Sequence, residues 1–175
     1  MSNIAQFDYN RQGQVFNAAN QSGATVTLIN TSTATGFILS NPAGSGKNLA
    51  LLTAAFTYTT VPTATAGVFL CMSIAPSPTA HATVTSLNIY KGDGSGVTTA
   101  CAARAYSAST TPNLPVYTRA LGYAPTTPAT TGGLTLRDYT EGSLILVPGT
   151  YLQISYIGQA PVGITDMSWL EYVAP

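Results

Sequence analysis

The sequence predicts an all-β protein, a single-domain antiparallel β-sandwich that is jelly-roll-like, with about 8–12 short strands and no long helix. Apolar and polar residues alternate with a period of two in short runs, and Gly, Pro, Asn and Ser bound these runs. No long segment combines the three-and-four apolar spacing of a helix with a cap. The 175 residues suit one domain. We expect it to span residues 14–175, behind a polar N-terminal arm at residues 1–13.

Six expected strands precede residue 91. In the fourth, Leu52, Phe56 and Tyr58 fall on one face and Thr53 and Thr57 on the other. Both faces of the fifth are apolar or small, as in a central strand that is covered on both sides. The six strands span Gln14–Ala18, Ala24–Asn30, Gly36–Ser40, Asn48–Val61, Gly67–Ala75 and Thr83–Tyr90.

Six more strands follow. In the last, Met167 and Trp169 share a face, and we expect Trp169, the single tryptophan, to anchor the core. Between the fourth and fifth of these strands, Pro148-Gly149 fits a type II turn, because Pro sets φ and Gly accepts positive φ. The six strands span Val97–Ser107, Leu114–Leu121, Leu134–Arg137, Ser143–Val147, Tyr151–Ile157 and Ile164–Val173.

Charge is scarce and unevenly placed. Only 7% of residues are charged, and Lys47 is the single charged residue from Gln12 to Tyr90. Phosphate neutralisation needs clustered Lys and Arg, so nucleic-acid partners are not expected. The outward faces must be built from Thr, Ser, Asn, Ala and Tyr, which suits burial against other protein copies. A neutral exterior on an ordinary β-domain fits the composition equally well. We expect the charges after Tyr90 to face water.

Targeting signals are not expected. Residues Met1–Asp8 contain no basic region followed by an apolar stretch, so no secretory signal is predicted. The most apolar segment, Gly67–Ala75, is far shorter than the roughly 20 residues of a membrane span. Cys71 and Cys101 are expected to be buried thiols, although a disulfide is possible if their strands are neighbours.

Motifs that resemble ligand sites are weak. The segment Gly44–Asn48 invites comparison with a phosphate-binding loop. However, Asn41 stands where the first Gly of that motif should be, and Asn48 stands where its final Ser or Thr should be. We therefore interpret the segment as a hairpin loop. Asp93 lacks the partner carboxylates of a calcium loop. The paired carboxylates Asp138 and Glu141, beside Arg137, would suit glycoside hydrolysis, but a solvated loop is the favoured interpretation.

His81, the single histidine, lies in a Pro/Thr/Ala loop and is expected to have no catalytic role. The sequence therefore predicts no catalytic, cofactor-binding or metal-binding residues, and no enzyme.

Three segments carry a family resemblance. The loop Asn41–Leu49, the turn Val147–Leu152 and the strand Ser168-Trp169-Leu170-Glu171 resemble motifs of small structural proteins of tailed bacteriophage virions. Such proteins carry a Pro-Gly-Thr turn and a terminal Trp-x-Glu strand in the same order. The resemblance spans about Gln14 to Val173 and implies a β-sandwich component on the outer surface of the particle. It implies no catalytic residues.

The leading hypothesis is therefore a non-enzymatic virion protein, foremost a capsid decoration (cement) protein made in the host cytoplasm. Its expected partners are itself, as a homotrimer, and the major capsid protein or another virion protein, with no nucleic acid and no membrane. A second hypothesis is a receptor- or glycan-binding module of a tail or head fibre, which the ten tyrosines would suit. A jelly-roll capsid or collar protein and a glycan hydrolase are further alternatives.

Overall fold

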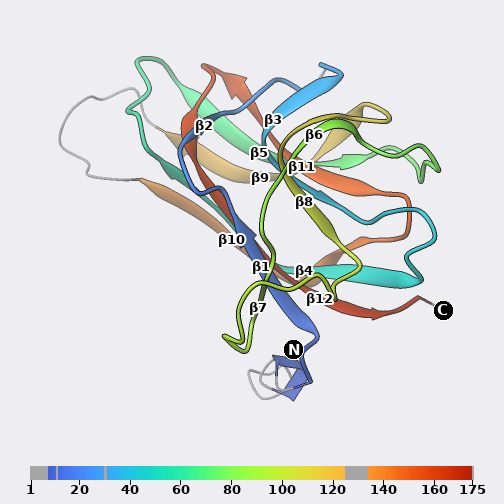
Figure 1. Ribbon diagram of the computed structural model, residues 1–175. Coiled ribbons are helices and arrows are strands. Elements are labelled where there is room, and N and C mark those ends of the chain that lie inside the picture. The colour runs from blue at the N-terminus through green and yellow to red at the C-terminus, as the bar shows by residue number, and fades with distance from the viewer. Residues whose placement is uncertain (1–7, 11, 30, 125–133, 175) are drawn as a thin grey trace.

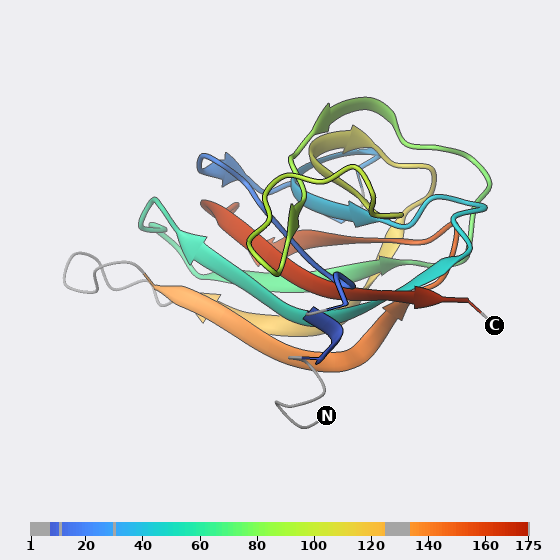
Figure 2. The same cartoon turned by 60° about the horizontal axis from the view of Figure 1, so that its bottom comes forward.

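A computed structural model describes residues 8–10, 12–29, 31–124 and 134–174 (Figure 1). The strands are β1 (Val15–Ala19), β2 (Ala24–Thr25), β3 (Thr33–Ser40), β4 (Lys47–Tyr58), β5 (Ala66–Ser73), β6 (Ala82–Ser86), β7 (Tyr90–Lys91), β8 (Arg104–Thr110), β9 (Pro115–Ala124), β10 (Thr135–Leu146), β11 (Tyr151–Gly158) and β12 (Val162–Val173). They form two six-stranded antiparallel sheets, stacked as layers (Figure 2). Sheet A has the order β10–β4–β12–β1–β7, with β2 paired to β12. Sheet B has the order β6–β8–β3–β11–β5–β9.

The strand order is that of a jelly roll. Neighbours β1, β12, β4 and β10 make up most of sheet A, and neighbours β3, β11, β5 and β9 make up most of sheet B. The chain passes between the sheets at most of its connections, as this topology requires. β6 and β8 extend sheet B beyond β3, and β7 is added beside β1. The predicted fold class is confirmed.

The core lies between the sheets, and Trp169 is its largest fully buried side chain. The Trp169 ring stacks on Phe16, with ring centroids 6.2 Å apart. Phe37, Phe56 and Leu152 belong to the same cluster. The predicted role of Trp169 as a core anchor is confirmed.

Leu52 does not lie on the predicted face of β4. It packs with Ala50 and Leu170 in a second cluster on the outer side of sheet A, whereas Phe56 and Tyr58 face the core. The pairing of β4 with β12 skips Leu52, which lies in a β-bulge. A bulge adds one residue to the strand and so changes the phase of the alternation beyond it.

Two predicted strands and the loop between them form the single strand β10. It pairs with β4 on both sides of an irregularity. Thr140 is buried there, and its hydroxyl donates to the carbonyl of Leu51. Glu141 and Gly142 have positive φ angles of 49° and 83°. The predicted loop is therefore a bulge, which displaces a few residues without ending the strand.

Two further predicted strands differ from the structure. Residues 83–90 are divided between β6 and β7, which belong to different sheets. The predicted strand at 97–107 is regular only from Arg104 onward. Ahead of it, Cys101 and Ala103 are buried in the core cluster. The backbone N–H groups of Ala102 and Ala103 donate to a side chain instead of a neighbouring strand.

Residues 8–10 form a helical turn against the domain. Tyr9 packs on the second cluster, and the Asn10 side-chain amide donates to the carbonyl of Gly92 at 3.0 Å. Residues 1–7 of the predicted arm lie outside the described residues, so the arm stays a prediction. Among the described residues, no helix has both the length and the apolar character to cross a membrane.

Candidate functional site

One end of the sandwich joins two of the motifs noted in the sequence. The side-chain amide of Asn41 donates to the carbonyls of Lys47 and Leu146, each at 2.8 Å. The backbone of Asn41 donates to the carbonyl of Thr150 and accepts from the N–H of Gly149, again at 2.8 Å. The loop after β3 is therefore fixed to the Pro-Gly turn before β11.

Glu171, from the third motif, is buried at the same end, where it pairs with Leu49 of β4. Its carboxylate accepts the backbone N–H groups of Ala102 at 2.9 Å and Ala103 at 3.0 Å. It also accepts the indole N–H of Trp169 at 3.3 Å. Three donors compensate for the lost hydration of the charge. The expectation that all charges after Tyr90 face water is wrong for Glu171, because its partners are supplied by a loop.

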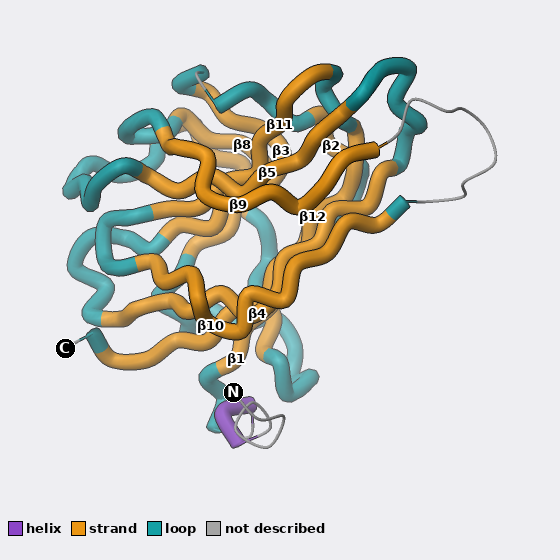
Figure 3. The backbone as a smooth tube through the Cα atoms, turned by 180° about the vertical axis from the view of Figure 1, so that it is seen from behind, coloured by secondary structure: helices purple, strands orange, loops and turns teal. Residues whose placement is uncertain are grey.

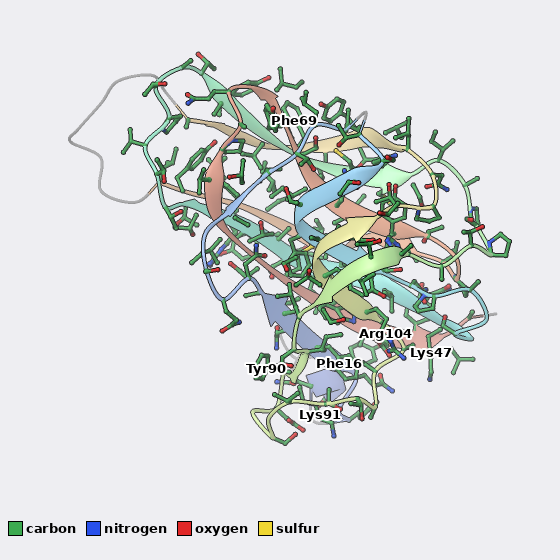
Figure 4. The ribbon with its side chains drawn as sticks, turned by 45° about the horizontal axis from the view of Figure 1, so that its top comes forward. Phe16, Lys47, Phe69, Tyr90, Lys91 and Arg104 are labelled. Atoms are coloured by element: carbon green, nitrogen blue, oxygen red, sulfur yellow. The ribbon has the colours of Figure 1, made fainter. Side chains whose placement is uncertain are left out.

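A pocket of about 290 Å³ opens beside these motifs. Its floor is the outer face of sheet B, where Arg104 of β8 pairs with Ser40 of β3 and Tyr106 follows two residues later. One wall is the segment 77–81 between β5 and β6, and the other is the loop at 41–43 with Gly149. Arg104 lies on the same side of the molecule as Lys47 and away from Phe69 (Figure 4).

His81 lies over this floor. Its ring centroid is 5.3 Å from that of Tyr106 and 4.9 Å from that of Tyr151. Its Nδ1 and the Ser109 hydroxyl form a hydrogen bond of 2.8 Å, in which either group can be the donor. Burial lowers the pKa of His81 to about 4, so the ring is neutral at pH 7.

This environment predicts a pH-dependent stability. The imidazole of the unfolded chain binds its proton near pH 6.5, and that of the folded chain only near pH 4. The free energy of unfolding should be highest above pH 6.5 and fall as the pH drops from 6.5 to 4, by about 1 to 2 kcal/mol after allowance for the half-exposed ring. Urea denaturation at pH 7, 5.5 and 4 measures this loss.

The matched variant is His81→Asn, which should show a flatter dependence over the same range. Burial raises the pKa of Asp166, and the charge of Arg137 partly offsets this rise. A carboxyl group with a raised pKa has the opposite effect on the pH dependence of stability, at lower pH. Its contribution is common to both proteins and cancels in the difference. Equal slopes for wild type and His81→Asn would contradict the prediction.

The charged group of the sequence, Arg137, Asp138 and Glu141, does not form a carboxylate pair facing one space. Asp138 turns toward sheet B, where its Oδ2 lies 2.6 Å from the Nε of Arg119 on β9. Glu141 is exposed on the bulge. Arg137 lies on the other face of the strand, with its Nη1 3.4 Å from the hydroxyl of Tyr139. The favoured interpretation as a solvated loop is also wrong, because the segment is a bulged edge strand.

The remaining sequence candidates have local roles. The loop before Lys47 joins β3 of sheet B to β4 of sheet A, so it is not the predicted hairpin. Asp93 accepts the N–H of Ser95 at 2.9 Å. Cys71 and Cys101 are buried free thiols, as predicted, and burial raises the pKa of Cys71 to about 12. Across the described ranges, no group of three His, Cys, Asp or Glu residues is placed to hold a metal ion.

Sequence reasoning did not identify the pocket. The available signal was the i, i+2 spacing of Arg104 and Tyr106 on a predicted strand, which places both on one face. The wall that carries His81 comes from a different part of the chain, and no sequence pattern joins the two.

Comparison of the chain with protein-family models, with curated proteins and with solved structures finds no match in any of the three.

Proposed function

We propose that this chain is a non-enzymatic structural protein of a bacteriophage virion, a capsid decoration (cement) protein that self-associates and binds the head exterior. The observation that carries the self-association is the side of the sandwich formed by β9 and β10. These are the free edge strands of sheets B and A, and they are neighbours across the two layers (Figure 3). Free edges present unpaired backbone N–H and C=O groups, which are templates for pairing with another chain.

We call the exposed side of β9 and β10 the edge surface. The strands span 10 and 12 residues, and the bulge after Tyr139 interrupts the edge of β10. Tyr139 is 63% exposed and Tyr123 is 53% exposed, and Val116 and Ile145 are also exposed. Exposed aromatic and aliphatic side chains on an unpaired edge favour burial against a second copy.

The outer face of sheet A supports a second, weaker contact. Thr57 and Thr135 share a hydrogen bond of 2.9 Å, and the Ser168 hydroxyl donates to the Asn17 side chain at 2.6 Å. Hydroxyl groups that already have partners lose less on dehydration than charged groups do. Weak neutral contacts of this kind, repeated in a homotrimer on a capsid lattice, would add through multivalency. The partners in this proposal are other copies and the major capsid protein or another virion protein.

The fold is compatible with this role. Jelly rolls serve as viral capsid domains and as lectins. A fold does not determine a function, so this support is an analogy. The proposed location is the outer surface of the virion. An electron cryo-microscopy map of the intact particle tests it, since density for this chain on the capsid lattice is expected and density confined to the tail would refute the decoration role.

Charge placed on the edge surface should disrupt self-association. We expect the double variant Tyr123→Lys, Ile145→Lys to weaken it by about a hundredfold, because lysine heads on both edges repel and block strand pairing. Sedimentation velocity over a concentration series measures the shift toward monomer. Leu28→Lys is the control, because Leu28 is 39% exposed, close to the 42% of Ile145, and lies in the connection between β2 and β3, outside the edge surface. An unchanged association of the double variant, or a wild type that is monomeric throughout, would refute this interface.

One observation favours the second candidate function, a glycan- or receptor-binding module of a fibre. Phe69 of β5 forms edge contacts with Tyr117 and Tyr123 of β9, with ring centroids 5.1 and 5.9 Å apart. Partly exposed aromatic rings can stack on sugar rings. Binding of the purified protein to host-cell glycans on a glycan array, lost in Tyr123→Ala, would support this candidate. No binding to glycans or cells would count against it.

A further inference from the structure

The pocket beside the Asn41 loop presents polar groups that have no hydrogen-bond partner among the described residues. They are Nε2 of His81, the hydroxyl of Tyr106 and Nη2 of Arg104. Nη1 of Arg104 donates to the carbonyls of Cys101, Ala102 and Ala103 at 3.2, 3.3 and 2.9 Å. One side of the guanidinium is thus anchored by backbone carbonyls.

The electrostatics of the pocket favour an anion. Arg104 is the only charged side chain among its lining residues, and no carboxylate lines it. The pKa of Tyr106 is raised by burial, and the nearby charge of Arg104 partly offsets this. The Tyr106 hydroxyl therefore remains protonated at pH 7 and can donate. Arg104 and Tyr106 lie two residues apart on β8 and both line the pocket. A guanidinium and a hydroxyl donor on one face are well suited to a carboxylate.

The shape of the pocket limits the size and kind of ligand. Its volume of about 290 Å³ leaves room for one sugar ring or a small hydroxy acid. The rings of Tyr106 and His81, tilted by 41°, and the ring of Pro78 provide apolar surface. Nε2 of the neutral His81 ring can hydrogen-bond to a ligand hydroxyl, because a hydroxyl group both donates and accepts.

We propose that this pocket binds a small hydroxylated carboxylate, with Arg104 and Tyr106 holding the carboxylate and Nε2 of His81 hydrogen-bonding to a ligand hydroxyl. Two sources share this chemistry, a free hydroxy acid and the terminal uronic acid of a glycan. The site is formed within one copy of the chain, so it goes beyond the proposed virion role and does not depend on assembly.

Titration of the full ¹⁵N-labelled chain, followed by NMR, tests the ligand class with three probes: galacturonate, lactate and galactose. We expect galacturonate to shift the amide signals of residues 79–81 and 104–106, and to bind about tenfold or more tightly than neutral galactose. Tight lactate binding would identify a free hydroxy acid as the source, and a strong preference for galacturonate would identify a sugar acid. Equal binding of galacturonate and galactose, or no shift with either acid, would overturn the proposal.

Variants test the assigned residues. Arg104→Met should weaken galacturonate binding about tenfold or more, and the control Arg137→Met, on the outer face of sheet A, should leave it unchanged. Because Arg104 also holds three backbone carbonyls, Tyr106→Phe provides a milder test that removes only the hydroxyl. Ala43→Trp, on the exposed loop at the pocket wall, should block entry without changing the core. Retention of full affinity in Tyr106→Phe and Ala43→Trp would overturn the assignment of the site.

Discussion

Replacement of Glu171 by alanine is expected to lower the free energy of unfolding by about 3 kcal/mol. The buried carboxylate accepts the N–H groups of Ala102 and Ala103 and the indole N–H of Trp169. Alanine would leave these three donors without their acceptor. Hydrogen bonds to a charged group contribute about 1.5 to 3 kcal/mol each, and bonds that share one acceptor group do not add fully. Urea denaturation at pH 7 measures the loss.

Two conservative Glu→Gln substitutions serve as matched controls. Glu171→Gln should lose about 1.5 kcal/mol, because one acceptor oxygen remains and the new NH₂ faces a backbone N–H. Glu141→Gln, at an exposed carboxylate, should stay within about 0.5 kcal/mol of wild type.

The loss of the carboxylate in Glu171→Ala should also release the Ala102–Ala103 segment and expose Cys101. The Cys101 thiol should then react faster with a disulfide reagent while Cys71 stays protected. A Glu171→Ala variant as stable as wild type would show that this network does not stabilise the fold.

The alternation of apolar and polar residues predicts the core correctly where the strands are regular. Trp169 and Met167 share the core face because β12 keeps its period of two up to Trp169. Leu52 was misplaced because residues 49–52 are all apolar, and such a run fits either phase. The bulge that decides between the phases arises from the pairing of β4 with β12 and β10. Strand pairing is a tertiary property that period counting within one strand cannot detect.

The burial of Glu171 could not be predicted for a related reason. Its backbone partners lie 68 and 69 residues away in sequence, and they are N–H groups of alanines that carry no polar side-chain signal. The Trp-x-Glu motif was visible as a resemblance, and the structure supplies its physical basis. The Trp169 indole and the Glu171 carboxylate form one hydrogen-bonded unit that fixes the irregular segment ahead of β8.

The pocket could not be predicted from the sequence for the same reason. The sequence predicts His81 as a loop histidine without a catalytic role, and the structure confirms its position in a loop. Its contacts with Tyr106 and Tyr151 depend on β8, β3 and β11 being consecutive neighbours in sheet B. Composition and turn signals predict that strands exist and predict a two-sheet fold, but they do not specify which strands lie side by side.

Trp169→Ala is expected to be the most destabilising single substitution considered, with a loss of about 4 kcal/mol in the free energy of unfolding. The side chain has no solvent exposure, and its ring stacks on Phe16. Alanine would leave a large cavity between the two sheets, and it would remove one of the three donors to Glu171. Circular dichroism is the appropriate measurement, because Trp169 is the only tryptophan and its fluorescence disappears with it.

Trp169→Phe separates the contribution of ring packing from that of the indole hydrogen bond to Glu171. Phenylalanine keeps much of the ring contact with Phe16 but lacks the indole N–H, so we expect a loss of about 2 kcal/mol. Combined with Glu171→Ala, it completes a double-mutant cycle, and the coupling energy should be about 1 kcal/mol because the two side chains share one hydrogen bond. Tyr139→Ala, at a ring that is 63% exposed, controls for aromatic loss alone and should change stability by less than about 0.5 kcal/mol. A coupling energy near zero would mean that the Trp-x-Glu pair stabilises the fold through packing alone, and a loss below about 2 kcal/mol for Trp169→Ala would contradict its role as the core anchor.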